Sequence, residues 1–114
     1  MSMTLKRDLF LGFVKLHILY HAGREPVFGV WLIEELQRHG YDVSPGTLYP
    51  MLHGLEEEGY LESRKEVVQG KARKYYRLTE TGQAALERGR AQAVELLREL
   101  YEDEDDPDLL QRRE

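Results

Sequence analysis

The sequence predicts a mainly α-helical fold with one two-stranded β-hairpin. Three segments before residue 60 have apolar side chains at helical spacing, residues 60–78 change to strand-like runs, and helical spacing returns from about residue 80. The chain has 114 residues, which is enough for one small domain with a terminal extension and too few for a Rossmann-type or barrel enzyme. It has no cysteine, which excludes a disulfide framework and cysteine-ligated metal sites.

The first two expected helices occupy residues 5–21 and 27–39. The first has a wide apolar face, which predicts burial on more than one side, and Gly23 and Pro26 follow it as helix breakers. In the second, Val30, Ile33 and Leu36 repeat the helical spacing. Gly40 is expected to end this helix as the residue after its C-cap.

A third helix is expected to begin at Ser44-Pro45. Serine is a good N-cap, and proline suits the first helical position because its missing N–H would have no partner there. Pro50 lacks the N–H that a helix interior needs, so either the helix bends at this point or its regular part begins near Pro50. Gly59 is the expected end.

A β-hairpin is expected next, with strands at residues 60–69 and 72–78 and a turn at Gly70-Lys71. Tyr76 and Leu78 fall on one side of the second strand and face a core. Residues 61–79 carry six basic and two acidic side chains, although the whole chain has a net charge of −5. A dense positive cluster within an acidic protein suggests that one face meets a polyanion.

A final helix is expected over residues 80–101, with Thr79 as its N-cap. Its apolar seam has near-heptad spacing and is expected to form a dimer interface; the seam residues are Leu86, Ala93, Val94, Leu97, Leu100 and Tyr101. The acidic segment 102–114 is expected to be a disordered tail.

Three helices, a hairpin and a further helix predict a winged helix-turn-helix with a C-terminal dimerisation helix. The expected boundaries are 1–79 for the winged helix-turn-helix, 80–101 for the dimerisation helix and 102–114 for the tail. Winged helices commonly read nucleic acid, but the fold alone does not establish function. The positive cluster lies in the hairpin, which would be the wing, and this supports a DNA partner.

Three motifs point to a known family: SPGTLYPML from Ser44, LEEEGYL from Leu55, and RKYYRLTETG from Arg73. In this combination the sequence resembles the PadR family of bacterial transcriptional regulators, in its short branch with a single helix after the wing. The resemblance implies a homodimer that binds palindromic promoter DNA and usually represses. It also implies a small aromatic effector that loosens DNA binding, and no catalytic residues.

The candidate DNA-binding residues lie in the third helix and the wing. The N-terminal part of a recognition helix lies nearest the bases, and lysine and arginine on a wing bind phosphates. The candidates are Ser44, Pro45, Gly46, Thr47, Tyr49 and His53 in the helix, and Lys65, Lys71, Arg73 and Lys74 in the wing. Lys71, at the expected tip, is the first candidate for a phosphate or minor-groove contact. The alternatives are that Ser44-Pro45 is only a cap, that Tyr49 packs locally, and that lysine merely protects a sheet edge.

Phe10 and Trp31 are candidates for the effector pocket, although such aromatic residues more often belong to a core. His17 and His21 stand one helical turn apart, a spacing that can bind metal. Two histidines without a further ligand make a poor site, so we expect a structural pair, no metal and no other cofactor. The carboxylates Glu34, Glu35 and Asp42 fit solvated helix or turn positions, and the glutamates 56–58 would keep the end of the third helix away from phosphate.

The sequence therefore predicts a ligand-responsive, sequence-specific transcriptional repressor and not an enzyme. An alternative is a winged helix that binds only proteins, although such a module would not need a basic wing. A histidine-based metal sensor is a third possibility. No apolar run approaches the roughly 18 residues that span a bilayer, and no signal peptide is evident, so a cytoplasmic location is expected.

Overall fold

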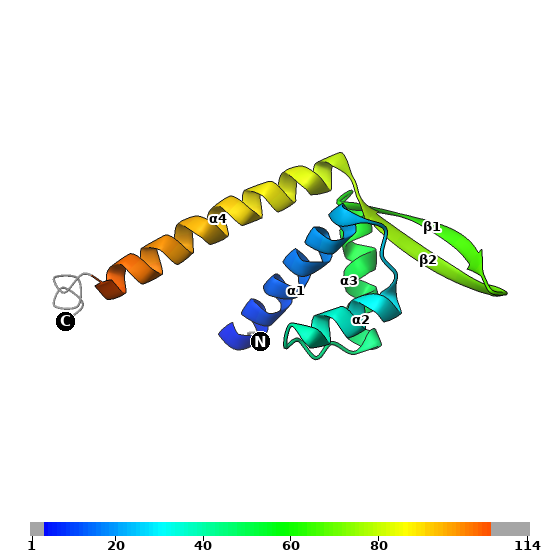
Figure 1. The fold of residues 1–114 in the computed structure, drawn as a ribbon, viewed down its shortest axis with the longest axis horizontal. Helices are drawn as coiled ribbons and strands as arrows, with labels where there is room; N and C mark the ends of the chain where they lie inside the picture. Colours follow the sequence, from blue (N-terminus) through cyan, green and yellow to red (C-terminus); the bar gives the residue numbers. More distant parts are fainter. Residues whose placement is uncertain (1–3, 106–114) are drawn as a thin grey trace.

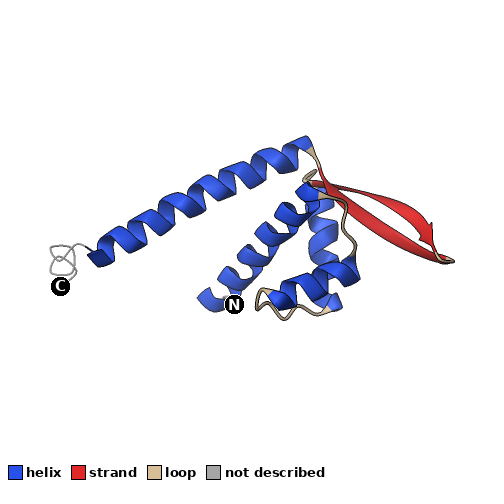
Figure 2. Cartoon of the chain, in the orientation of Figure 1, coloured by secondary structure: helices blue, strands red, loops and turns tan. Residues whose placement is uncertain are grey.

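The computed structural model describes residues 4–105 and has the predicted winged helix-turn-helix arrangement (Figures 1 and 2). Its elements are α1 (Leu5–Arg24), α2 (Gly29–Arg38), α3 (Pro45–Glu57), β1 (Leu61–Val68), β2 (Lys71–Leu78) and α4 (Glu80–Asp105). In Figure 1, α1, α2 and α3 form a central body, the β1–β2 hairpin projects from one end, and α4 extends beyond the other. The molecule is elongated, with principal extents of 63 × 30 × 28 Å.

One hydrophobic core holds the three helices of the body and the base of the wing. Each helix contributes from a single stripe, and α4 contributes only near its beginning. The side chains with the lowest exposure are Val14, Ile18, Leu32, Leu36, Leu48, Leu52, Leu61 and Tyr76. Because α3 packs on this core along its length, its opposite side is left free for a ligand.

The start of α3 follows the predicted capping chemistry. The Ser44 hydroxyl accepts a hydrogen bond from the Thr47 N–H at 3.3 Å, and Pro45 is the first helical residue. The helix continues through Pro50 to Glu57, so the option in which it begins near Pro50 is wrong. Gly59 follows the helix with a φ of 85°, which explains why glycine occupies this position.

The tip of the wing lies one residue earlier than predicted. Val68 pairs with Lys71, and the two-residue turn consists of Gln69 and Gly70 with φ values of 51° and 78°. A turn with two positive φ angles matches the twist of the strands, and glycine at its second position reduces the backbone strain. Lys71 therefore begins β2 instead of forming the tip.

The connection between α1 and α2 is fastened to the wing. The Val27 N–H donates to the Tyr76 carbonyl at 2.9 Å, and the Tyr76 N–H donates to the Val27 carbonyl at 2.7 Å. Val27 is therefore bridged to a strand and cannot belong to α2. This bridge explains why α2 begins at Gly29 and not at residue 27 as predicted.

A tight corner joins the end of α3, the base of the wing and the start of α4. The Thr79 N–H donates to the Tyr60 carbonyl at 3.1 Å, and its hydroxyl donates to the Gly59 carbonyl. The same hydroxyl accepts from the Gly82 N–H at 3.0 Å, which confirms the predicted N-cap. Gly82 is buried, and a Cβ there would lie 2.1 Å from the Tyr60 carbonyl oxygen. Only glycine fits at this corner.

The predicted seam of α4 divides into a buried start and an exposed remainder. Leu86 is only 6% exposed and packs in the core of its own chain, which leaves little of its side chain available to a partner subunit. Ala93 is half-buried, whereas Val94, Leu97, Leu100 and Tyr101 are 40–62% exposed. The difference arises because α4 contacts α1 near its beginning and then leaves the body (Figure 1).

The helix α4 also runs four residues further than predicted, to Asp105. The expected disordered tail is therefore wrong for residues 102–105, because glutamate is a good helix former and negative charge alone does not end a helix. Residues 106–114 of that tail lie outside the described residues. Within residues 4–105, no helix has the length and apolar character needed to cross a membrane.

We predict that Gly82→Ala lowers the free energy of unfolding by about 1–3 kcal/mol, because the added methyl group would displace the rigid Tyr60 backbone. Chemical denaturation followed by circular dichroism measures this change. Gly54→Ala is the control, because a Cβ at Gly54 has no neighbour within 4 Å. Equal stability of the Gly82→Ala variant and the parent would show that the corner is not tightly packed.

Candidate nucleic-acid interface

The N-terminal part of α3 presents small and polar groups. Gly46 and His53 are exposed, whereas Thr47 is half-buried. The hydroxyls of Ser44 and Thr47 lie 3.3 Å apart and are hydrogen-bonded to each other, so both take part in the cap. A Cβ at Gly46 would lie 3.8 Å from the Ser44 hydroxyl oxygen, an ordinary contact, so the backbone there is open to a ligand. The helix N-terminus favours an anion.

Tyr49 is fixed against the start of α2. A Cβ at Gly29 would lie 2.3 Å from the Tyr49 hydroxyl oxygen and less than 3 Å from its ring, so the phenol lies directly on the Gly29 backbone. The side chain is nevertheless 39% exposed. The local-packing alternative for Tyr49 therefore has a structural basis, and any contact with DNA would come from a ring that is already held in place.

The basic residues of the wing are divided between its two faces. Lys65 pairs with Lys74, and both lie on the same face as Leu61 and Tyr76, which pack on the body. Lys71 and Arg73 lie on the opposite face. These four side chains therefore form two pairs on opposite faces and not one group.

Lys74 and the end of α3 share an electrostatic contact. The Lys74 ammonium lies 3.9 Å from Glu56 and 5.5 Å from the centre of the Tyr76 ring. Glu56 also accepts a hydrogen bond from the Ser63 hydroxyl at 2.7 Å. Glu56 therefore ties α3 to both strands of the wing and is not simply a solvated charge.

Arg73 has a structural role on the other face. Its guanidinium carbon lies 4.2 Å from the centre of the Phe28 ring, and Phe28 makes an edge-to-face contact with Tyr75 at 5.4 Å. Arg64 and Arg77 on this face form ion pairs with Glu66 and Glu62. The two contacts with Phe28, the N-cap of α2, fasten the wing to the start of that helix, whereas the two ion pairs lie within the wing.

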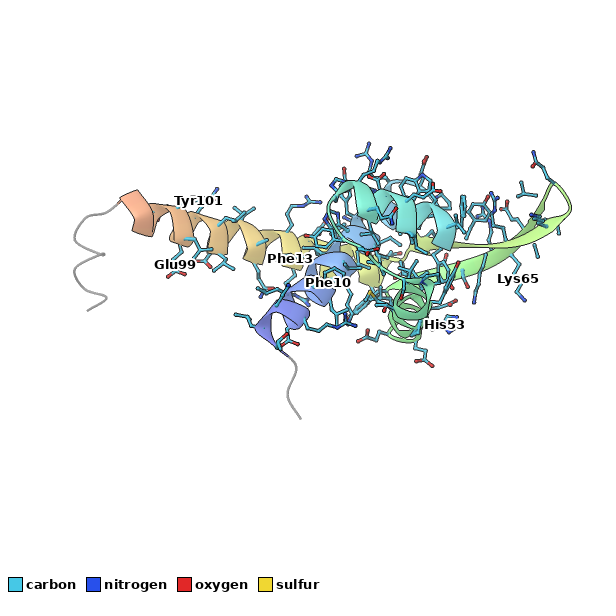
Figure 3. The ribbon with its side chains drawn as sticks, turned by 90° about the horizontal axis from the view of Figure 1, so that it is seen from below. Phe10, Phe13, His53, Lys65, Glu99 and Tyr101 are labelled. Carbon is cyan, nitrogen blue, oxygen red and sulfur yellow. The ribbon has the colours of Figure 1, made fainter. Side chains whose placement is uncertain are left out.

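Among the described residues, Lys65 and Lys71 have no ion-pair partner, and both are exposed. In Figure 3, Lys65 on the wing and His53 on α3 lie along the same side of the molecule. We call the surface formed by Pro45, Gly46, Tyr49, His53 and Lys65 the α3–wing face. It combines a helix N-terminus, hydrogen-bonding side chains and an unpaired cation.

The two candidate effector residues contact different neighbours. Phe10 contacts Tyr41 with ring centres 5.7 Å apart, and Trp31 contacts His21 at 5.4 Å. Trp31 borders hollows on α2 that are lined mainly by polar residues. A hollow of about 430 Å³ with a more apolar lining lies elsewhere, between α1 and α4. Its lining residues are Phe13, Leu16, His17, Tyr20, His21, His39, Leu86, Arg90, Ala93 and Val94.

A cluster of three histidines lies at the same α1–α4 hollow. His17 and His21 from α1 meet His39, the C-cap of α2, with ring centres 4.8–6.2 Å apart. Burial lowers the pKa of both His17 and His21. His39 was missed by the sequence analysis because its approach to α1 depends on the packing of two helices.

Glu35 completes this cluster. It is only 8% exposed, so the expectation of a solvated carboxylate is wrong. Its carboxylate lies 3.0 Å from His39 Nε2 and 3.6 Å from His21 Nε2, and it also pairs with Arg38. The hydrogen bond from Arg38 lowers the pKa of Glu35. The spacing of Glu35 to Arg38 and His39 on one helix was the available signal in the sequence.

The fold and the α3–wing face define a winged helix-turn-helix protein of the kind that regulates transcription. The model of the PadR-like family of transcriptional regulators matches residues 18–88. The chain is 56% identical over 94 residues to the transcriptional regulator Rv3488 of Mycobacterium tuberculosis, covering 82% of this chain and 88% of that protein. The chain therefore belongs to the PadR-like family of transcriptional regulators, which are not enzymes.

Solved structures agree with this assignment. A PadR family regulator from Eggerthella lenta matches with a TM-score of 0.75 and 33% identity, over 86% of this chain and 87% of that one. A PadR-like regulator from Bacillus cereus matches with a TM-score of 0.76 and 29% identity, over 83% and 94%. The predicted family and fold are confirmed.

We predict that Lys65→Gln stabilises the fold by about 0.2–1 kcal/mol at low salt, because two like charges lie directly opposite across the strands. Unfolding measured at low and high salt separates the charge effect from any change in strand propensity, since salt screens only the former. Lys65→Arg retains the charge and is the control. A gain in stability that is the same at both salt concentrations would contradict the electrostatic cause.

Proposed function

We propose that this chain binds double-stranded promoter DNA through the α3–wing face and represses transcription. The observation that carries the proposal is the Lys65–Lys74 pair. Two lysines opposite each other on a two-stranded sheet disfavour the folded state, and within residues 4–105 only Lys74 of the two has an ion-pair partner. A phosphate beside Lys65 would supply the missing negative charge, which supports a polyanion as the partner of the wing.

Base reading is proposed for the start of α3. A recognition helix contacts bases with its N-terminal residues, and the exposed side of α3 offers Gly46, Tyr49 and His53 there. The N-cap Ser44, with Thr47 hydrogen-bonded to it and Pro45 between them, would position the helix N-terminus against a phosphate. Lys65 and Lys71 would contact the flanking backbone, with Lys74 beside them, whereas Arg73 holds the wing.

We infer a homodimer from the apolar surfaces of α1 and α4. Leu5, Leu9 and Phe13 on α1 are 48–71% exposed, and Leu97 and Tyr101 on α4 are 50–62% exposed. Exposed apolar residues in such number mark an interaction surface, and a second copy with the same two helices would bury both. A palindromic operator would match the two-fold symmetry of this dimer.

An effector site is proposed in the hollow between α1 and α4, which replaces the pocket expected at Phe10 and Trp31. Phe13, Leu16 and Tyr20 provide an apolar lining for a small aromatic molecule. Because the hollow adjoins the proposed dimer surface, a ligand there would alter the relative orientation of the two α3 helices and release DNA. A protein that regulates a promoter in this way would act in the cytoplasm.

The chief alternative is a module that binds only proteins, and the two functions make different predictions for DNA. Fluorescence anisotropy compares DNA from upstream of the chain's own gene with a scrambled duplex at two salt concentrations. A sequence-specific repressor binds the upstream fragment more tightly and loses affinity with salt. Weak binding without preference for this or other promoter fragments would favour the protein-binding module.

We predict that Lys65→Gln weakens binding to all duplexes and lowers the salt slope by about 0.9 per subunit, because one phosphate contact is lost. Arg64→Gln is the matched control, because Arg64 lies on the opposite face of the same strand and pairs with Glu66. A salt slope that is unchanged in the Lys65→Gln variant would remove Lys65 from the DNA backbone.

We predict that Leu97→Glu raises the dimer dissociation constant by at least about 100-fold, since a buried charge without a partner costs about 3–5 kcal/mol. Analytical ultracentrifugation measures this change. Gln92→Glu adds the same charge to an exposed position elsewhere on α4 and is the control. A Leu97→Glu variant that remains dimeric would place the interface elsewhere.

A further inference from the structure

We propose that His17, His21 and His39 form a binding site for a divalent transition metal ion, with Glu35 as the adjoining carboxylate. The residues come from two helices that cross, and the proposal does not depend on DNA binding. It differs from the expectation of a structural histidine pair because the fold supplies a third histidine and a buried carboxylate.

The geometry allows coordination after small movements. One ligand atom from each histidine lies within 4.8 Å of the others. Zinc–nitrogen bonds of about 2.0–2.1 Å in a tetrahedral site place neighbouring ligand atoms about 3.3–3.4 Å apart, so each imidazole needs to move by about 1 Å or less. The His39 side chain is 46% exposed at a helix end, which leaves it room to rotate.

The chemistry of the donors fits zinc and its neighbours. Imidazole nitrogen suits Zn²⁺, Ni²⁺, Co²⁺ and Cu²⁺, whereas Mg²⁺ and Ca²⁺ prefer oxygen ligands. Arg90 borders the hollow and Arg38 pairs with Glu35, so the carboxylate is the negative group that offsets the positive charge around the cluster.

A second observation points to a missing partner. His21 Nε2 is buried and has no hydrogen-bond partner within the described residues, since Glu35 at 3.6 Å is too distant. Buried polar atoms are nearly always satisfied, and an exception calls for an explanation. A metal ion bound at this nitrogen would supply its partner, and the hollow between α1 and α4 gives the ion a path from solvent.

The carboxylate has the position that metal sites use to orient histidine. Glu35 lies 3.0 Å from His39 and is itself held by Arg38. Carboxylates that hydrogen-bond to a ligand histidine fix its ring and raise its basicity, and their loss lowers metal affinity by about 10–100-fold. Glu35 therefore either orients the histidines or supplies the fourth ligand, and Glu35→Gln weakens both arrangements.

Titration of the full chain, without a polyhistidine tag and after removal of bound metal, tests the proposal. Zn²⁺ is titrated against a competing chelator, and Co²⁺ reports the ligand set through its visible absorption. We expect one ion per chain. Glu35→Gln should lower the affinity by about 10–100-fold, and His39→Ala by at least as much.

His53→Ala is the matched control, because it removes the fourth histidine of the chain from the exposed side of α3 without changing the cluster. Circular dichroism of the metal-free variants confirms that they are folded. His17→Ala gives a second loss at a different ligand. Zn²⁺ affinity that is unchanged in both His39→Ala and His17→Ala, or that falls equally in His53→Ala, would overturn the proposal.

Discussion

The rest of the structure depends on the contact between the Tyr60 carbonyl and the backbone of Thr79 and Gly82. At this corner α3 has just ended, the wing begins and ends, and α4 starts. A side chain at Gly82 would separate these elements, and without the Thr79 hydroxyl the Gly82 N–H would lose its cap. These contacts fix the direction in which α4 leaves the body relative to α3. The helix proposed to join two subunits, α4, is therefore coupled to the helix proposed to read DNA, α3.

A second constraint is that the two faces of the wing differ. One face is fastened to α2, and the other carries the lysine that is proposed to bind phosphate. On one side, Arg73 stacks on Phe28 and fastens the hairpin to α2. On the other, Glu56 lies near Lys74, whereas Lys65 has no ion-pair partner in the part of the chain that the structure describes. Evolution toward stability alone would remove such a like-charge pair, whereas function often retains local strain. The proposed role of Lys65 in binding phosphate accounts for a feature that packing does not explain.

Much of the fold could be predicted from the sequence because its boundaries are set by local chemistry. Ser44 and Thr79 cap helices, and Gly40 and Gly59 adopt the positive φ angles that end them. The predicted turn, Gly70-Lys71, was one residue too late. Gln69 as well as Gly70 adopts a positive φ angle, and only the glycine signals this conformation in the sequence.

Features that arise from helix packing could not be predicted from the sequence. Leu86 and Leu97 belong to one apolar seam, yet the first is buried and the second exposed, because α4 leaves the body between them. Likewise, His39 joins His17 and His21 only through the crossing of α1 and α2.

The central claim, that a symmetric dimer holds two α3 helices at the spacing of successive major grooves, is tested most directly by a distance measurement. Since the chain has no cysteine, Glu57→Cys places a single spin label on each α3 helix, at its exposed C-terminal end and away from the residues proposed to read bases. Pulsed electron resonance on the DNA-bound protein should give one narrow distribution close to about 34–36 Å. A broad distribution, or no dipolar signal between labels, would contradict a rigid dimer that reads DNA with both helices.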